Sequence, residues 1–539
     1  MGLSTTYTKT ETDFLIQKLE EKTSDKYNDE PNSIANDIIK FIDINTGENV
    51  NYRETKTWHD GSLMDDSKVD GVIYIKKEGK YFELQYDSIL NVRWFGAKGD
   101  GITDDTESFT KALNAGKSIF IPAGKYLVGK LKIPMKFKGQ KIFGVGYNHW
   151  NSNDGTVLQA IDTEIFSFEN GADWIKISDL RLEGNYNSDY GFNAEFGANI
   201  ILDNLGVYNF NEIGIKSRQG LWRISNCFIA RNKIGLELYS DSSVSNSEFT
   251  GGEIPLKVVA GGNRFVNCWI NSGTVNCIHI TPLNENTNNH NNSFVGCYIG
   301  EVYTTGESPI IVISGNNSKR CTTQLFSNCF IVNGASDIQG SNGFFDINKS
   351  DDVIINGCSF QGQGSYSSGS KKTSYCLKIA NSFAITLSNC NIYGINSTSI
   401  VTDNISRLNI TGNVFSNCGD NSQLATEIPI MNLSDDTFVT AITNNIFFNL
   451  DSNVYALNAV SMLHIMFENN YLYYPSPKTI ITSGNWAGSY FRAGGIKTEV
   501  RKVLKSKIST EAPLNPQDGD FYFDTTQNKI LTFYNGNWQ

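Results

Sequence analysis

The chain has 539 residues, of which 40% are hydrophobic and 12% aromatic, and it contains 48 glycines but only 11 prolines. This composition favours strands and turns over helices, and the length allows several domains or one long repeat array. The formal net charge of −11 argues against a nucleic-acid backbone or an anionic membrane as the main partner.

The first residues, "MGLSTTYTKTETDFLIQKLEEK", lack a basic start followed by an apolar core, which argues against a secretory signal. No apolar run approaches the length of a membrane span, so we expect synthesis in a cytoplasm and no membrane insertion. The ten cysteines form no CxxC pair and the five histidines are scattered. We therefore expect neither a metal site nor another cofactor.

Two small units are expected ahead of residue 92. In residues 5–24, apolar side chains recur among Glu and Lys behind Ser and Thr, which predicts a short helix within an N-terminal anchor, residues 1–34. Residues 35–91 are expected to form the second unit. Its stretch "VDGVIYIKKEGKYFELQY" has the order of a strand, a Glu-Gly turn and a strand, which predicts a β-hairpin.

The stretch "VRWFGAKGDGITDDTESFTKAL", residues 92–113, is rich in acids. Asp104, with Glu107 three residues on, predicts a capping box for a helix at about 104–115. The following "SIFIPAGKYLVG" predicts a strand, a turn and a strand. The acids do not have the spacing of an EF-hand, and a helix here would cover the open end of the repeats that follow. We therefore favour a cap over a catalytic or metal site.

Short β-rich segments recur from residue 224 to residue 450, at intervals of roughly 20–30 residues, which is the pattern of a solenoid. Each is bounded by Gly and Asn, so the pattern predicts an all-β fold, a parallel β-helix over residues 92–490, followed by a small β-rich module, residues 491–539. The aligned segments are "ISNCFIARN", "VSNSEFTGG", "FVNCWINSG", "FVGCYIGEV", "FSNCFIVNG", "INGCSFQGQ", "LSNCNIYGI", "ITGNVFSNC" and "ITNNIFFNL".

The alignment gives the cysteines a structural role. Strand alternation places their column on the inward face, where we expect packed thiols rather than disulfides or catalysis. The Asn that precedes several of them predicts left-handed turn residues whose amides stack in a ladder. The cysteines are Cys227, Cys268, Cys297, Cys329, Cys358 and Cys390, and the asparagines are Asn226, Asn246, Asn267, Asn328 and Asn389.

Four stretches carry a resemblance to known families. "FGAKGDGITDDTESFTKAL" followed by "IFIPAGKYLV" resembles the N-terminal signature of the pectate-lyase-like right-handed β-helix superfamily, in which this segment caps the solenoid. "YTKTETD" resembles a segment frequent in bacteriophage tail fibres, and "WHDGSLMDDSKVDGVIYIKKEGKYFELQY" resembles the particle-proximal region of phage tailspikes. "DGDFYFDTTQNKILTFYNGNW" is similar to small modules at the C-termini of phage tail proteins.

The resemblance implies a phage tailspike that degrades a bacterial surface polysaccharide, capsule or O-antigen. Such proteins are homotrimers in the virion tail and attach through their N-terminal region to the tail or baseplate. The catalytic motifs of polygalacturonases and pectate lyases are absent from this sequence, and tailspike sites share no common motif. The site is therefore sought among the outward columns of the solenoid.

One outward column follows the cysteines and contains Phe228, Glu248, Trp269, Tyr298 and Phe330. Outward aromatic rings are costly unless covered, so we expect either a subunit interface or a platform for sugar rings. Glu248 beside these rings would have a raised pKa and act as an acid. Glu301 is expected two rungs further on, roughly 10 Å away, which is near the carboxylate separation of an inverting glycosidase.

A second outward column contains Lys216, Glu237, Lys257 and His279. One interpretation is a surface salt-bridge ladder, which contributes little to stability. The other is a charged groove in which Glu237 acts as acid or base and Lys257 or His279 binds an acidic sugar. The leading hypothesis for the protein is two-carboxylate hydrolysis of a polysaccharide; a polysaccharide lyase and a non-catalytic receptor-binding spike stay open.

Overall fold

The computed structural model describes most of the chain from residue 34 to residue 418 and shorter stretches beyond it. The predicted helix at residues 5–24 lies outside the described residues. The described residues are 34–35, 38–43, 46–151, 153–302, 308–333, 343–362, 373–395, 397–418, 428–434, 437, 440–448, 454–459, 465–473, 480–482, 490–492, 521–524, 529–534 and 537–538.

The N-terminal unit is a five-stranded antiparallel sheet with strand order β1-β2-β3-β5-β4. Its strands are β1 (Ile34–Ala35), β2 (Ile38–Ile42), β3 (Asn49–Thr55), β4 (Tyr74–Lys77) and β5 (Lys80–Gln85), and the short helix η1 spans Asp66–Lys68. The predicted hairpin is confirmed as β4 and β5. Its turn residues Glu78 and Gly79 both have positive φ, 52° and 79°, as a two-residue hairpin turn requires.

A cap closes the first turn of the solenoid. It comprises β6 (Ile89–Asn91), η2 (Val92–Phe95), β7 (Asp100–Asp104), helix α2 (Thr106–Asn114), β8 (Ser118–Phe120) and β9 (Gly124–Val128). Helix α2 buries Phe109, Ala112 and Leu113, and the Phe109 ring contacts Tyr126 edge-on at 5.4 Å. The predicted covering helix is thus confirmed.

The predicted capping box is wrong in its Glu107 half: the Asp104 carboxylate accepts from the backbone N–H of Thr106, the first helical residue, at 2.9 Å, but Glu107 is engaged elsewhere. The residue before the helix is Asp105, which is almost fully buried and accepts hydrogen bonds from the backbone N–H groups of Lys98 and Gly99, at 2.7 and 3.1 Å. Glu107 instead pairs with Lys111 at 2.7 Å along the exposed side of the helix. The buried carboxylate of Asp105 therefore closes the preceding turn by accepting from its backbone N–H groups.

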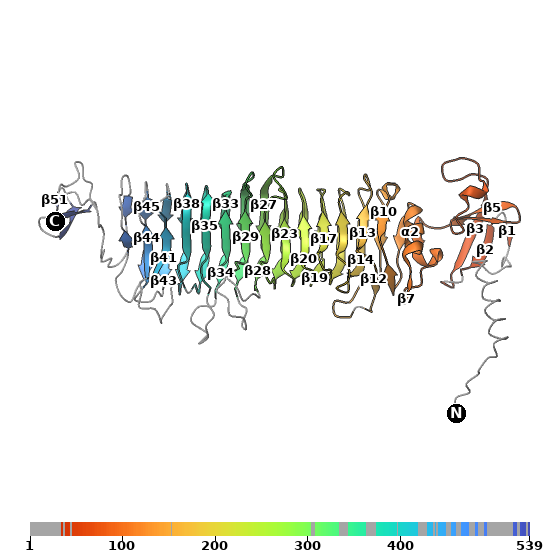
Figure 1. The fold of residues 1–539 in the computed structure, drawn as a ribbon, viewed down its shortest axis with the longest axis horizontal. Coiled ribbons are helices and arrows are strands. Elements are labelled where there is room, and N and C mark those ends of the chain that lie inside the picture. Colours follow the sequence, from red (N-terminus) through yellow and green to blue (C-terminus); the bar gives the residue numbers. More distant parts are fainter. Residues whose placement is uncertain are drawn as a thin grey trace, which may run out of the picture.

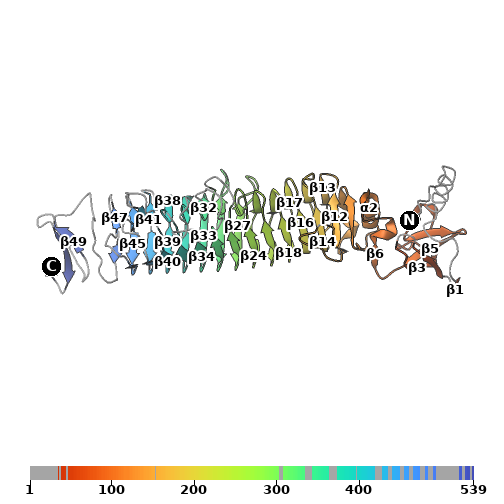
Figure 2. The same ribbon diagram turned by 90° about the horizontal axis from the view of Figure 1, so that it is seen from below.

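The chain then forms a parallel β-helix, as predicted (Figures 1 and 2), and its strands lie on three faces. Face A is one 14-stranded parallel sheet. Its strands are β10 (Leu131–Ile133), β13 (Glu164–Phe168), β15 (Tyr190–Ala194), β17 (Ile213–Ser217), β20 (Ile234–Leu238), β23 (Ile254–Val258), β26 (Ile278–Ile280), β29 (Ile311–Ser314), β32 (Phe345–Asn348), β35 (Leu377–Ser382), β38 (Ile400–Ile405), β41 (Ile428–Leu433), β44 (Val454–Ala459) and β47 (Ile480–Thr482).

Faces B and C belong to one continuous sheet that bends at a left-handed residue in each rung. The strands β14 (Lys176–Glu183) and β16 (Ile201–Tyr208) run through both faces. Face B continues with β11 (Lys141–Phe143), β18 (Arg223–Ser225), β21 (Ser243–Ser245), β24 (Arg264–Val266), β27 (Asn289–Val295), β30 (Cys321–Ser327), β33 (Ser350–Asn356), β36 (Ile385–Ser388), β39 (Leu408–Thr411), β42 (Thr440–Thr443), β45 (Ile465–Glu468) and β48 (Tyr490–Arg492).

Face C begins with β7 and β9 of the cap and carries the outward aromatic column. It continues with β12 (Thr156–Ala160), β19 (Phe228–Ala230), β22 (Glu248–Thr250), β25 (Trp269–Asn271), β28 (Tyr298–Gly300), β31 (Phe330–Val332), β34 (Ser359–Gln361), β37 (Asn391–Tyr393), β40 (Val414–Ser416), β43 (Ile446–Phe448) and β46 (Tyr471–Tyr473). A short helix η3 spans Met135–Phe137. The C-terminal module contributes an antiparallel sheet of β49 (Phe521–Asp524), β50 (Lys529–Tyr534) and β51 (Asn537–Trp538).

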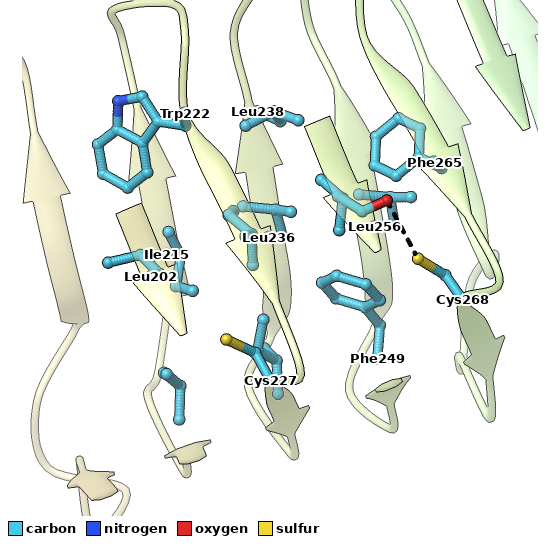
Figure 3. Packing of buried hydrophobic residues seen from close by; sticks show 14 of the residues in the cluster. Leu202, Ile215, Trp222, Cys227, Leu236, Leu238, Phe249, Leu256, Phe265 and Cys268 are labelled. Carbon is cyan, nitrogen blue, oxygen red and sulfur yellow. Dashed lines mark hydrogen bonds between the residues drawn. The ribbon is translucent and has the colours of Figure 1, made fainter. Parts of the chain in front are cut away.

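The interior is filled by columns of like side chains. All ten cysteines are free and buried, which confirms the expected packed thiols. Figure 3 shows Cys227 and Cys268 pointing into the same core as Phe249, Leu236 and Leu256. Burial raises the pKa of the Cys227 thiol to about 12, so the group stays protonated and behaves as a small apolar side chain.

The asparagines ahead of the cysteines are left-handed, as predicted. Asn226, Asn246 and Asn267 have φ of 55°, 49° and 52°, and glycine occupies the same position in other rungs, as at Gly296 and Gly357. Amide-to-amide hydrogen bonds form at the surface, as from Asn389 to Asn356 at 3.0 Å, and also inside the core. There Asn413, Asn445 and Asn470 are buried, and each amide donates to the next at 3.0 Å.

Replacing a left-handed asparagine by alanine tests the bend between faces B and C. We expect Asn267→Ala to destabilise the solenoid by about 1 kcal/mol, because alanine adopts positive φ at a cost. Asn267→Gly is the matched control and should stay close to wild type. Thermal unfolding of both variants measures the difference, and equal melting temperatures would contradict the strain argument.

Candidate functional site

The predicted outward column exists on face C. The register pairs Phe228 with Glu248, Glu248 with Trp269, Trp269 with Tyr298 and Tyr298 with Phe330. The rings of Trp269 and Tyr298 stack at 4.2 Å, and those of Tyr298 and Phe330 lie 5.8 Å apart. Trp269 is 47% exposed. Parallel pairing holds neighbouring members about 4.8 Å apart. The column is therefore a strip of aromatic rings with one carboxylate, that of Glu248, among them.

Glu248 is the chemically distinctive member of this column. Its side chain is half-buried between the neighbouring residues Phe228 and Trp269. Burial raises the pKa of its carboxyl group, and among the described residues no hydrogen bond or ion pair opposes that effect. A carboxyl group that is accessible, unpaired and harder to ionise is suited to donate a proton.

Glu301 lies farther from Glu248 than the rung count alone suggests. It follows β28 in a left-handed conformation with φ of 61°, three residues beyond Tyr298. The two residues are thus separated by two rungs along the axis, about 10 Å, and by roughly another 10 Å across it. Their side chains must lean toward each other to reach the about 6.5–9.5 Å of an inverting pair.

The second predicted column is also in register on face A, but its central residue, Glu237, is enclosed and not open to solvent. Lys216, Glu237, Lys257 and His279 are successive partners. Glu237 is only 3% exposed, and its carboxylate binds Lys257 at 2.8 Å and also Arg218. Burial opposes its ionisation, but the hydrogen bonds and charges of Lys257 and Arg218 outweigh burial and lower its pKa. Glu237 is therefore held as an ionised, enclosed carboxylate.

His279 and Lys257 do not offer free cations at this column. Burial, assisted by the charge of Lys257, lowers the pKa of His279 to about 4, so the ring is neutral at physiological pH. Its Nε2 lies 3.3 Å from the Ser314 hydroxyl. Lys257 is already engaged with Glu237. The arrangement agrees with the salt-bridge interpretation, except that its central carboxylate is buried rather than on the surface.

A segment that the sequence did not single out lies beside the outward column. Residues 144–151 follow β11 and are anchored by Arg181, whose guanidinium donates to the backbone carbonyls of Asn148 and His149 at 3.2 and 3.4 Å. Arg181 also pairs with Glu183 at 2.5 Å, with both side chains 6% exposed. Its guanidinium lies 3.9 Å from the centre of the Tyr208 ring.

This anchoring places His149 at the N-terminal end of the aromatic strip. The His149 ring packs against Phe228 at 4.8 Å, and its Nδ1 lies 3.1 Å from the Tyr208 hydroxyl. Burial and then the nearby charge of Arg181 lower the pKa of His149, which favours the neutral ring. The next residue, Trp150, is 87% exposed. The segment thus adds a neutral imidazole at this end of the strip, followed in the chain by an exposed indole.

Arg181, Glu183 and Arg218 were missed because their local sequence pattern is also that of ordinary surface charges. In β14, Arg181 and Glu183 alternate with buried leucines, as two outward charges on any solvated strand would. Arg181 and Glu183 are buried only because residues 144–151 cover them. Arg218 lies just after β17, in a turn whose conformation the repeat does not define.

No group of three or more potential metal ligands occurs within the part of the chain that the structure describes. In the same residues, no helix is long and apolar enough to cross a bilayer.

Residues 89–151 match the family model described as "Rhamnogalacturonase A/epimerase, pectate lyase-like". The pre-neck appendage protein of Bacillus phage B103 is 28% identical over 169 residues, which are 30% of this chain and 17% of that protein. The chain spans at most 17% of the length of the curated relatives it matches.

Solved structures with a similar course of the chain include two polysaccharide-active enzymes. The catalytic unit of the α-1,3-glucanase from Streptomyces thermodiastaticus aligns with a TM-score of 0.48 and 12% identity, over 77% of this chain and 75% of that chain. The tailspike gp49 from the Acinetobacter baumannii bacteriophage Fri1, a capsular polysaccharide depolymerase, aligns with a TM-score of 0.38 and 11% identity, over 93% of this chain and 79% of that chain.

Removing the enclosed carboxylate tests the role of Glu237. We expect Glu237→Gln to destabilise the protein by about 3 kcal/mol, because Arg218 and Lys257 lose their shared counter-ion. Since the folded pKa lies below the ordinary 4.5, this contribution exists above that pH and is lost as the pH falls through the folded pKa. Thermal unfolding measured from pH 7 down to pH 3 should show the wild type and the variant converge.

Glu212→Gln is the matched control, because Glu212 pairs with Lys233 at 3.1 Å on the surface, with side chains 46% and 41% exposed. That substitution should cost less than about 1 kcal/mol. Equal losses for the two variants would contradict the enclosed character of Glu237.

Proposed function

We propose that this chain is a phage tailspike that binds and cleaves a bacterial surface polysaccharide, capsule or O-antigen, on face C. The observation that carries the proposal is the unpaired, half-buried Glu248 within a strip of exposed aromatic rings. Sugar rings present apolar C–H faces that stack on aromatic side chains, and a carboxyl group with a raised pKa supplies the proton that a leaving glycosidic oxygen needs.

The sequence comparisons support the virion setting. The matched stretch of the Bacillus phage B103 protein belongs to an appendage of the particle. The family model over residues 89–151 is that of enzymes named for polysaccharide chemistry. We therefore place the chain in the phage tail, made in the host cytoplasm and attached through its N-terminal region to a tail or baseplate protein.

In the hydrolytic mechanism that we favour, Trp269 and Tyr298 bind the sugar rings and Phe228 borders the strip at its N-terminal end. Glu248 protonates the glycosidic oxygen between two bound sugars. A second carboxylate then activates the attacking water, and Glu301 is this chain's candidate for that base.

A lyase is the second candidate, and the position of His149 favours it. Elimination needs a base near a proton next to a sugar carboxylate, and a neutral imidazole beside Phe228 can accept that proton. In this reading Glu248 still protonates the leaving oxygen. A non-catalytic spike would use the same aromatic strip only to hold the glycan.

A single incubation with purified host polysaccharide separates these functions, with Glu248→Gln as the test variant. We expect the wild type to release new reducing ends without the ultraviolet absorbance of an unsaturated uronic product. That absorbance would indicate elimination, and the absence of fragments would contradict catalysis. Glu248→Gln should lower the rate at least about 100-fold, because the proton donor is lost.

The exposed Glu253, which lies on the same rung as Glu248, supplies the control variant Glu253→Gln and should keep full activity. Activity of the wild type should fall as the pH rises through the raised pKa of Glu248, where the donor ionises. The same shift makes the folded state prefer protonated Glu248, so Glu248→Gln should not lower stability at neutral pH. Full cleavage by Glu248→Gln would show that the acid lies elsewhere.

We further propose that three chains associate through the C-terminal rungs, which leaves the strip near Glu248 open to glycan. Four apolar side chains on faces B and C are 38–45% exposed there: Ile354, Ile446, Phe448 and Met466. Such a surface is costly in water unless a partner covers it. Sedimentation should give three times the 59.9 kDa chain mass, and a monomer would contradict the proposal.

A further inference from the structure

A hollow of about 300 Å³ lies where three successive rungs pass from face A to face B, away from the aromatic strip. Arg223, Ser243 and Arg264 begin the three face B strands and are partners in register, so the two arginines flank the serine. They are two rungs, about 10 Å, apart, and their long side chains can converge on one group between them.

The floor of the hollow is rigid. Trp222 is fully buried, and its Nε1 donates to the Gly197 carbonyl at 2.8 Å. Its backbone N–H donates to the Ser242 hydroxyl at 3.0 Å, and the backbone N–H of Ser242 donates to the Asn263 amide oxygen at 3.1 Å. Buried donors that are all satisfied hold the three turns in place before any ligand arrives.

The rim combines charge with an exposed apolar surface. Leu221 is 49% exposed and adopts φ of 67°, a conformation that a branched side chain rarely takes. Asp241 follows at the equivalent turn of the next rung, with φ of 53°. A leucine held in this conformation at the surface is an outlier that suggests a function for its exposed side chain.

The two arginines lack counter-ions within the described part of the chain. Some outward cations of the solenoid are paired, as in Lys176–Asp203 at 2.9 Å and Lys233–Glu212 at 3.1 Å, whereas Arg223 and Arg264 have no such partner among the described residues. In a chain with net charge −11, the two guanidinium groups outnumber the single carboxylate, that of Asp241, among the described residues that line the hollow, so the hollow keeps a net positive charge that suits an anion. The guanidinium fork matches a carboxylate, and Asp241 and Ser243 can bind neighbouring hydroxyls.

We infer that this hollow binds a carboxylate-bearing sugar of the polysaccharide, with Arg223 and Arg264 on the carboxylate and Leu221 against the apolar face of the ring. The inference rests on the proposed function and deepens it, since it assigns an acidic polysaccharide as the substrate class. It also assigns a second, non-catalytic attachment point on a face next to the one that carries Glu248.

Binding of defined oligosaccharides to the full chain carrying Glu248→Gln tests the inference without cleavage. The probes are a hexamer of galacturonic acid and a neutral glucose hexamer, measured by titration calorimetry at low salt. We expect the acidic hexamer to bind at least tenfold more tightly than the neutral one. Arg223→Gln and Arg264→Gln should each weaken acidic binding about tenfold, because each removes a charged hydrogen-bond donor.

Lys141→Gln is the matched control, because Lys141 begins a face B strand in the same column, three rungs away from Arg223. Unchanged acidic binding in both arginine variants would overturn the inference. So would displacement of the acidic hexamer by inorganic phosphate as efficiently as by free galacturonate, which would indicate a simple anion site. Loss of oligomer mass in the arginine variants would instead assign the hollow to a subunit contact.

The binding test and the cleavage test fail separately. If wild-type protein cleaves nothing but the acidic hexamer binds as expected, the proposed catalysis is wrong and the sugar-acid site stands. If cleavage depends on Glu248 but the arginine variants bind normally, the catalytic proposal stands and this inference falls.

Discussion

Parallel hydrogen bonding between successive rungs is the constraint on which the rest of the structure depends. The pairing carries Phe228, Glu248, Trp269, Tyr298 and Phe330 through one register without a slip. A shift of a single residue would turn these side chains into the core and expose the cysteines. The register therefore determines both what fills the interior and what a ligand meets outside.

Register also explains which features could be predicted from the sequence. Inward and outward columns follow from strand alternation within each short repeat, which is a local property. The burial of Cys227 and the exposure of Trp269 could therefore both be predicted. The left-handed asparagines were predictable for the same reason, since the bend recurs at one position of the repeat.

Features that depend on turns and on contacts between distant segments were not predictable. The buried acid of the cap is Asp105 rather than Asp104, because the backbone N–H groups of Lys98 and Gly99 donate hydrogen bonds to Asp105. The sequence pattern alone predicts Glu237 to be a surface charge. Its enclosure depends on the ion pair with Arg218, which lies in the turn of the preceding rung. The position of His149 depends on Arg181, 32 residues away in the chain.

The buried and half-buried ionic groups Glu237, Arg181 and Glu248 differ in whether they have a partner. Glu237 is buried with Lys257 as its partner, and Arg181 is buried with Glu183. Removing either partner would leave an uncompensated buried charge. Glu248 is half-buried without a partner, which costs stability in the absence of ligand. The proposed catalytic role gives a reason for keeping such a group, since perturbed pKa values cluster at functional sites.

The same reasoning applies to Arg223 and Arg264, which stay unpaired among the described residues beside a rigid floor, whereas Lys176 and Lys233 are paired. The aromatic strip and this hollow lie on adjacent faces, joined within one rung by the bend at Asn226. A rigid stack of rungs keeps the spacing between the two sites constant. On the proposed function, a polymer bound at both sites would be held in one orientation across the solenoid and would present the same type of linkage to Glu248 at each encounter.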